Sequence, residues 1–269
     1  MPIEVPFDRL AAFAPYFADV HATLVVDSIL AGNTLGRLWI GPGDAALLWD
    51  QGNNVFYLAA PALDHGSQSA LAALLADTIR PAALAGGRGY FKARALDPAS
   101  EPALPAIFGP LRALPTRLYS LDGPPAPVAA PAVERLSFRL IDRAFWADDS
   151  LENSAALREE VGWMWPSAER FLDQGFGVAA LSASRLICWC TAEYRGAGRC
   201  GIGIATEPEY AGRGVASATA ARFLGHCREL GVAPFWECRR DNAASVRVAE
   251  KVGFALLAEE VFWSGQFIS

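Results

Sequence analysis

Residues 209–217 read EYAGRGVAS and run directly into an apolar helical pattern. The strand-like run Gly201–Thr206 precedes this stretch. Its small residues lie where a turn opens a helix, so we expect several backbone N–H groups there to remain unpaired and accessible. Such N–H groups and the helix dipole both favour negative charge. The stretch therefore predicts an anion site of the kind that holds a pyrophosphate-bearing cofactor.

A proline-rich segment divides the sequence. Residues 121–131 read LDGPPAPVAAP, a composition that favours an extended linker and excludes a regular helix. We therefore expect an N-terminal α/β domain without a phosphate loop over residues 1–122, a linker over 123–133 and a second domain over 134–269.

The periodicity of the first domain alternates between helix and strand. A helix is expected over Asp8–Leu30, interrupted at Pro15, and another from an N-cap at Ser67 to Ile79, with Pro81 ending it or opening one more turn. The expected strands are 36–40, 45–50, 54–60, 89–93 and 115–119.

The second domain has the predicted order β-β-β-α-β-α-β after a set of N-terminal helices. Its expected elements are the strands 175–182, 185–194 and 199–206, the helix 213–230, the strand 233–239, the helix 243–252 and the strand 254–263. This order predicts an α/β (α+β) fold in which helices flank a mixed central sheet.

Two motifs on these elements resemble those of one acyltransferase superfamily. The turn Gly212–Ala216 looks like the R/Q-x-x-G-x-G/A pyrophosphate loop of the GNAT N-acetyltransferases, and Asn242-x-x-Ser245, continuing to Gly253-Phe254, is similar to their closing motif. Short segments such as 234–236 (PFW) resemble those of a two-domain branch of this superfamily that includes zwittermicin-resistance-type acetyltransferases. The resemblance covers about residues 136–265 and implies a GNAT-like C-terminal domain. The first domain is then either a degenerate GNAT-like copy or an unrelated fold.

The resemblance implies acetyl-CoA as the acyl donor and no metal. Strand 202–206 would offer backbone groups to the pantetheine, and the loop N–H groups would hold the pyrophosphate. Arg213 is either a phosphate contact or a solvated loop residue. The implied cofactor-binding residues are Ile204, Ala205, Thr206, Ala211, Gly212, Arg213, Gly214, Val215, Ala216, Ser217, Asn242 and Ser245.

Two positions depart from the superfamily pattern. Ala211 stands where Arg or Gln is common, and Ala249 stands where a tyrosine commonly protonates the departing thiolate. The general acid is therefore unassigned, and the candidates are Ser245, a water molecule and a substrate group. Glu193, expected at the end of the strand that begins at Arg185, is the first candidate for the general base. Glu237 is the second, since a carboxylate within an apolar strand is expected to have a raised pKa. Each has the alternative of an ordinary surface charge.

These residues predict an N-acetyltransferase that acts on an amine by direct attack in a ternary complex. The alternative is a catalytically weak acyl-CoA-binding module for sensing or assembly. We expect the acceptor to be a small amine or an amino terminus, and the protein to be a monomer or homodimer. The net charge of −6 without a basic run argues against nucleic acid, and short apolar runs argue against a membrane. Five unpatterned cysteines favour a reduced, cytoplasmic protein.

Overall fold

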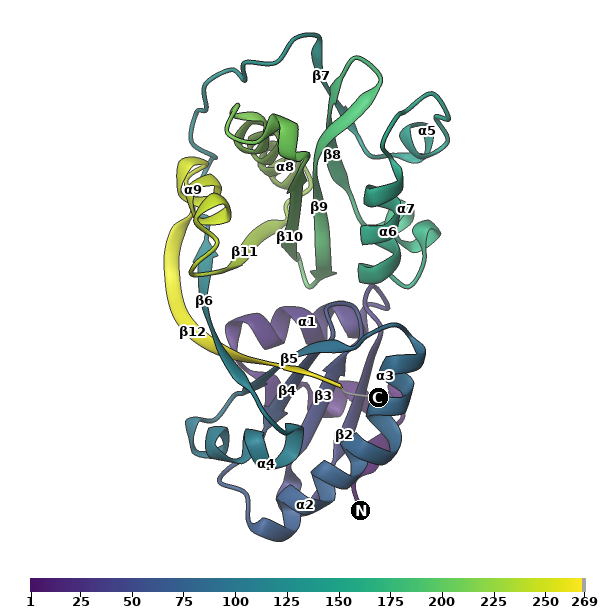
Figure 1. Ribbon diagram of the computed structural model, residues 1–269, viewed down its shortest axis with the longest axis vertical. Coiled ribbons are helices and arrows are strands. Elements are labelled where there is room, and N and C mark those ends of the chain that lie inside the picture. The colour runs from purple at the N-terminus through teal and green to yellow at the C-terminus, as the bar shows by residue number, and fades with distance from the viewer. Residues whose placement is uncertain (268–269) are drawn as a thin grey trace. The chain divides into compact units, whose positions relative to one another are not determined.

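Short apolar runs separated by turn residues form strands in the N-terminal part of the chain (Figure 1). The runs 46–50 (ALLWD) and 55–59 (VFYLA) are buried throughout, and the turn between them holds Asn54 at a φ of 51°, which asparagine tolerates. The computed structural model describes residues 1–267. It divides into unit 1, which contains residues 1–115 and those from Val261 onward, and unit 2, which contains Thr116–Glu260.

Unit 1 is a mixed sheet with helices on both faces. Its strands are hydrogen-bonded in the order β1-β2-β3-β4-β5-β12, and only β4 and β5 run parallel. The elements that lie wholly in this unit are β1 (Ile3–Val5), α1 (Val20–Leu30), β2 (Gly36–Ile40), β3 (Ala46–Asp50), β4 (Val55–Ala59), α2 (His65–Leu74), α3 (Arg80–Ala85), β5 (Tyr90–Ala95) and α4 (Leu104–Phe108).

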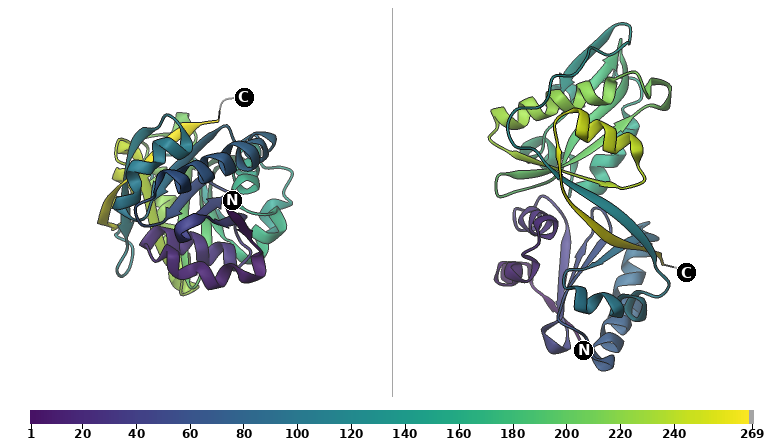
Figure 2. Two further views of the ribbon diagram at one scale, coloured as in Figure 1. Left: turned by 90° about the horizontal axis from the view of Figure 1, so that it is seen from below. Right: turned by 90° about the vertical axis from the view of Figure 1, so that its left-hand side faces the viewer.

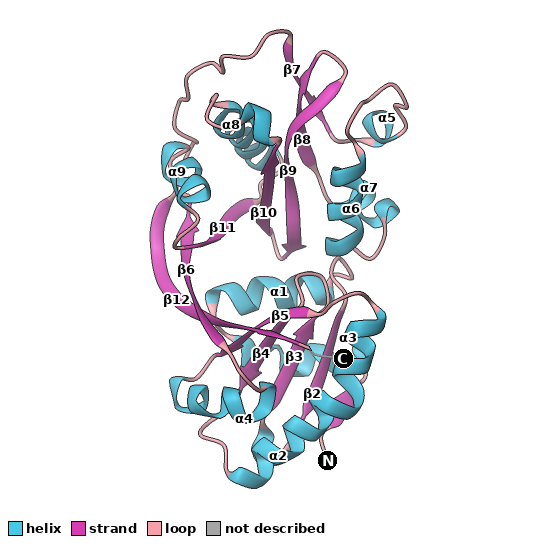
Figure 3. Cartoon of the chain, in the orientation of Figure 1, coloured by secondary structure: helices cyan, strands magenta, loops and turns pink. Residues whose placement is uncertain are grey.

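The strands of unit 2 are hydrogen-bonded in the order β7-β8-β9-β10-β11-β6, and only β10 and β11 among them run parallel (Figure 3). Its elements are β7 (Leu136–Leu140), α5 (Arg143–Trp146), α6 (Ala155–Met164), α7 (Ala168–Gln174), β8 (Gly177–Ser182), β9 (Arg185–Gly196), β10 (Arg199–Thr206), α8 (Val215–Glu229), β11 (Ala233–Arg239) and α9 (Ala243–Lys251).

The two units repeat one topology and exchange their last strands. In each unit, helices follow the first, fourth and fifth strands, and the fourth and fifth strands are the parallel pair. The sixth strand of unit 2, β6, comes before its other strands in the sequence, and the sixth strand of unit 1, β12, comes after the strands β7 to β11 of unit 2. β6 (Arg112–Ser120) pairs with β11 of unit 2, and β12 (Ala255–Gln266) pairs with β5 of unit 1. The N-terminal part therefore repeats the topology of the C-terminal part.

The core of unit 2 lies on one face of its sheet. Alternate residues of β9, β10 and β11 on this face pack against α8 and α9, and Phe176 stacks on Phe223 at 4.9 Å between ring centroids. The ribbons of α8 and α9 cover this face of the sheet (Figure 2). The opposite face of β9 carries α6, and the nearby Trp165 donates its indole N–H to the carbonyl of Ala192. Because side chains alternate along a strand, neighbouring residues of these strands lie on opposite faces of the sheet.

Several local expectations differ from the structure. The N-cap of α2 is Asp64, whose carboxylate accepts the N–H of Ser67, so the predicted cap at Ser67 was wrong. Pro81 does not end the helix, because it follows a π turn and occupies the first turn of α3, where a missing N–H costs little. The helix expected over 8–30 is a 3₁₀ run, Phe7–Phe17, followed by α1.

The proline-rich segment lies within unit 2 and is attached to it by backbone hydrogen bonds. The N–H of Ala126 donates to the carbonyl of Val252, and that of Ala132 donates to Arg213. The unit boundary falls earlier, within β6, between Pro115 and Thr116. In the part of the chain that the structure describes, no helix is both long and apolar enough to cross a membrane.

Candidate functional site

The turn before α8 presents a row of backbone donors. Gly212 and Gly214 have φ values of 75° and 83°, a region that glycine adopts without strain, and Gly214 caps α8 without a side chain. The first helical N–H with a backbone acceptor is that of Ala218, bonded to the Gly214 carbonyl at 3.1 Å. Within residues 1–267, the N–H groups of 215–217 have no acceptor. They form an anion cradle at a helix N-terminus.

The strands β10 and β11 diverge beside this cradle. Their parallel register ends at Gly201 and Phe235, although β10 continues to Thr206. The N–H of Glu207 bonds to the carbonyl of Ile187 on the β9 side, so by alternation the backbone groups of Ile204 and Thr206 point to the open side. An extended ligand can therefore add to β10 along this edge.

Unit 1 lacks both features at the corresponding place. Asp64 puts a carboxylate on the N-terminus of α2, where it occupies a first-turn N–H and repels anions. The strands β4 and β5 stay paired to Leu58 and Ala95, and the N–H of Leu96 then bonds to Leu58. The anion cradle therefore belongs to unit 2.

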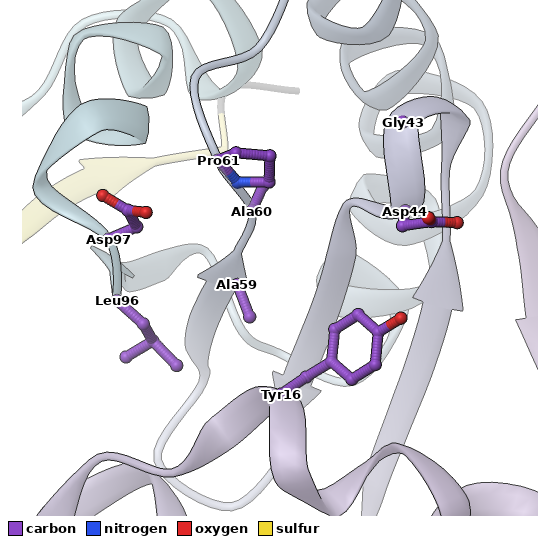
Figure 4. A pocket seen from close by; sticks show the side chains of 8 residues that line it. All are labelled: Tyr16, Gly43, Asp44, Ala59, Ala60, Pro61, Leu96 and Asp97. Carbon is purple, nitrogen blue, oxygen red and sulfur yellow. The ribbon is translucent and has the colours of Figure 1, made fainter.

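A pocket of about 390 Å³ lies at the ends of β4 and β5 in unit 1 (Figure 4). Its lining includes the acidic residues Asp44 and Asp97 and the ring of Tyr16, and no basic residue is among the described residues that line it. Because carboxylates repel phosphates, this pocket is unsuited to a diphosphate.

Glu193 lies within β9 and not at its end, which is Gly196. The register of β9 and β10 shifts here, because Glu193 and Tyr194 together oppose Gly201. Such a bulge re-aims a side chain. The carboxylate of Glu193 covers Gly203, where an added Cβ would lie 2.6 Å from Glu193 Oε1. The carboxylate of Glu193 therefore lies directly against Gly203, at a place where a side chain on residue 203 would collide with it.

The three predicted catalytic residues divide between the faces of the sheet. Glu237 alternates with Trp236, whose side chain lies in the α8–α9 core, so Glu237 shares the opposite face with Glu193. Ser245 lies on the core face, where its Oγ accepts the indole N–H of Trp236 at 3.0 Å. Because this bond uses the oxygen as an acceptor, the Ser245 hydroxyl can still donate its proton.

The N-terminus of α9 is arranged as its motif predicts. Asn242 is the N-cap, and its Oδ1 accepts the N–H of Ser245 at 3.2 Å. One turn later, Ala249 is completely buried in the core and offers no acidic proton. The tyrosine Tyr119 of β6 lies in the same core cluster, and burial raises its pKa.

Sequence reasoning missed Glu160 of α6. Its Oε2 accepts the indole N–H of Trp189 at 2.8 Å, and its Oε1 accepts the hydroxyl of Thr191 at 3.1 Å. Burial raises the pKa of this carboxyl, although both hydrogen bonds oppose the rise. A signal existed, because Glu160 falls on the apolar stripe of α6 with Leu157, Val161 and Met164.

The cysteines are buried and free. Burial raises the thiol pKa of Cys188, and it raises that of Cys190 further. Neither thiol is therefore activated as a nucleophile. No group of three or more His, Cys, Asp or Glu residues within residues 1–267 could hold a metal ion.

Most of the sequence of unit 2 is similar to known proteins. Residues 132–259 match the family model described as GNAT acetyltransferase. A curated relative, the uncharacterized N-acetyltransferase YdfB of Bacillus subtilis (strain 168), is 34% identical over 131 residues. That match covers 48% of this chain, and the chain spans about half the length of the relative, 49%. The resemblance predicted from the two motifs is confirmed.

Solved structures share the fold along nearly the whole chain. A GCN5-related N-acetyltransferase-like protein from Streptococcus suis has a TM-score of 0.68 at 19% identity, covering 95% of this chain and 98% of that one. A tandem GNAT protein from the clavulanic acid biosynthesis pathway has a TM-score of 0.58 at 15% identity, covering 100% and 99%. The fold prediction is therefore confirmed, with a mixed sheet, flanking helices and GNAT-like architecture in both parts.

Proposed function

From the GNAT acetyltransferase sequence of residues 132–259, we propose that the protein transfers an acetyl group from acetyl-CoA to an amine, either a small molecule or an amino terminus. The observation that carries the proposal is the glycine-capped start of α8 beside the divergence of β10 and β11. The cradle suits a diphosphate, and the open edge at Ile204 and Thr206 suits the amides of pantetheine.

The transfer needs one base and one proton donor. Acetyl-CoA supplies a thioester whose carbonyl carbon accepts the lone pair of the amine, and the C–S bond breaks as the amide forms. Glu193 removes the proton that the nitrogen loses, with Glu237 on the same face as the second candidate. The departing thiolate is a good leaving group, so the C–S bond needs a dedicated acid less than a C–O bond would. The Ser245 hydroxyl, a water molecule or a substrate group donates a hydrogen bond or a proton to the thiolate.

One observation favours a second function. Ala249 is completely buried, and so the position that would carry an acidic tyrosine supplies no proton. A protein that binds acyl-CoA in the same cradle but transfers the acyl group poorly would act as a sensing or assembly module. Both functions require the cofactor, and they differ in turnover.

Two measurements on the intact chain separate these functions. Thermal unfolding with and without acetyl-CoA tests binding, because a ligand of the folded state raises the midpoint. Release of free thiol from acetyl-CoA over a panel of amines tests transfer. Binding with amine-dependent thiol release supports the acetyltransferase, binding without release supports the module, and no binding would refute both.

A further inference from the structure

Glu160 is a partly buried carboxylate without a positive partner. Its two hydrogen bonds come from the neutral groups of Trp189 and Thr191. Within residues 1–267 it forms no ion pair with Lys, Arg or His. Two other partly buried carboxylates do have such a partner, since Asp19 pairs with Arg94 and Glu207 with Arg185.

An uncompensated charge in such surroundings costs free energy, so its retention needs a reason. The two hydrogen bonds hold the carboxylate in one orientation and leave further lone pairs on its oxygens. A glutamine would preserve both bonds. Its amide oxygen would accept from Trp189, and its NH₂ group would donate to the Thr191 hydroxyl. Structure alone therefore does not require the negative charge of Glu160.

Glu160 borders the proposed transfer site. The strand residue that it bonds, Thr191, lies directly opposite Gly203 in the register of β9 and β10. Gly203 is the residue over which the proposed base Glu193 lies. Trp189 and Thr191 therefore place the Glu160 carboxylate on the face where the amine must approach the proposed base.

We propose that Glu160 binds a positively charged ammonium group of the acceptor and supplies its counter-charge. This inference rests on the proposed amine acceptor, but it is about binding and not about transfer. It assigns the acceptor to the class of amines that are protonated when they bind. The indole of Trp189 and the hydroxyl of Thr191 act as positioning groups for the carboxylate.

The first test measures amine binding without turnover. Wild-type protein saturated with CoA is titrated with 1,4-diaminobutane, with butylamine and with a short peptide bearing a free amino terminus, and 1,4-butanediol serves as the uncharged reference. We expect at least one amine to bind and the diol not to bind. Glu160→Gln should weaken that binding roughly ten- to a hundredfold, the range for a hydrogen bond to a charged group.

The matched control is Glu159→Gln, which removes the same charge from an exposed neighbour on the same helix. It should leave amine binding unchanged. Thermal unfolding gives an independent reading, because loss of an uncompensated charge should leave the midpoint of Glu160→Gln equal to or above that of the wild type. A merely structural Glu160 would instead lower the midpoint and leave amine binding intact.

The outcomes separate this inference from the proposed function. Equal amine affinity in wild type and Glu160→Gln would overturn it, as would failure of all three amines to bind wild type. Amine binding that depends on Glu160 without any thiol release would refute the transfer and support the inference. Thiol release by Glu160→Gln with an unchanged amine KM would support the transfer and overturn the inference.

Discussion

A carboxylate at position 214 should weaken acetyl-CoA binding, because Gly214 caps α8 beside the proposed pyrophosphate cradle. An added Cβ at this glycine would lie 3.7 Å from the Cα of Pro131, which is an ordinary contact. Gly214→Asp therefore fits sterically and adds one negative charge. Gly214→Asn has the same shape, tolerates the same positive φ and adds no charge, so it is the matched control.

The magnitude follows from the exposure of the loop. Because Gly212 and Arg213 are exposed, the dielectric constant of water applies, and two unit charges about 5 Å apart repel by about 0.8 kcal/mol. A diphosphate presents about two negative charges, which gives about 1.7 kcal/mol. The Kd of the aspartate variant should therefore be roughly fifteenfold above that of the asparagine variant. Both variants share a left-handed backbone cost of about 1 kcal/mol.

Isothermal titration of acetyl-CoA at low and high ionic strength measures this difference. The ratio of the two Kd values should shrink as salt is added, because these charges are exposed and screened. Thermal unfolding of both variants checks that they fold equally well. Equal Kd values at low salt would mean that no diphosphate binds beside Gly214, and the cofactor proposal would fail with it.

Three further predictions concern the base and the acid limit of stability. Glu193→Gln should lower kcat by roughly a hundredfold or more with an unchanged Kd for acetyl-CoA, and an unchanged kcat would exclude Glu193 as the base. Gly203→Ala should also lower kcat, because its Cβ would displace the Glu193 carboxylate. The same variant should lose about 1–3 kcal/mol of stability in urea unfolding. Wild-type kinetics in this variant would contradict the contact between Gly203 and Glu193. Burial raises the pKa of Asp19, but the N–H of Ala22 and the guanidinium of Arg94 outweigh burial and hold the pKa below its ordinary value. The pair therefore stabilises unit 1 above the unfolded-state pKa near 3.9, and this contribution is lost as the pH falls through the folded-state pKa. Urea midpoints of the wild type should decline over that window more steeply than those of Asp19→Asn, and parallel declines would argue against the pair.

Local signals in the sequence predicted the turn and the helix starts on which the cofactor proposal rests. The closing motif at Asn242 and the glycines around Arg213 act over three or four residues, and the structure has Asn242 as the N-cap of α9. Choosing between nearby caps was less certain, because Asp64 and Ser67 both suit a helix start and only Asp64 has the extended backbone of a cap.

The catalytic half depends on contacts that the sequence does not encode locally. Glu160 reaches Trp189 and Thr191 across roughly thirty residues, through the packing of α6 on β9. The bulge at Glu193 arises from strand register and not from a turn residue. The exchange of β6 and β12 was not predicted, since each strand pattern is compatible with either sheet.

The exchanged strands have a consequence for synthesis on the ribosome. The sheet of unit 1 needs residues 263–266 of β12 beside β5, and these are made only after all of unit 2. The edge of β5 in unit 1 therefore has no partner strand until the end of synthesis. In unit 2, by contrast, β6 is made before the other strands. An open strand edge invites pairing with other chains. Vectorial synthesis thus makes β6 to β11 of unit 2 before the residues of β12 that complete the sheet of unit 1, so the N-terminal copy receives its last strand at the end of synthesis.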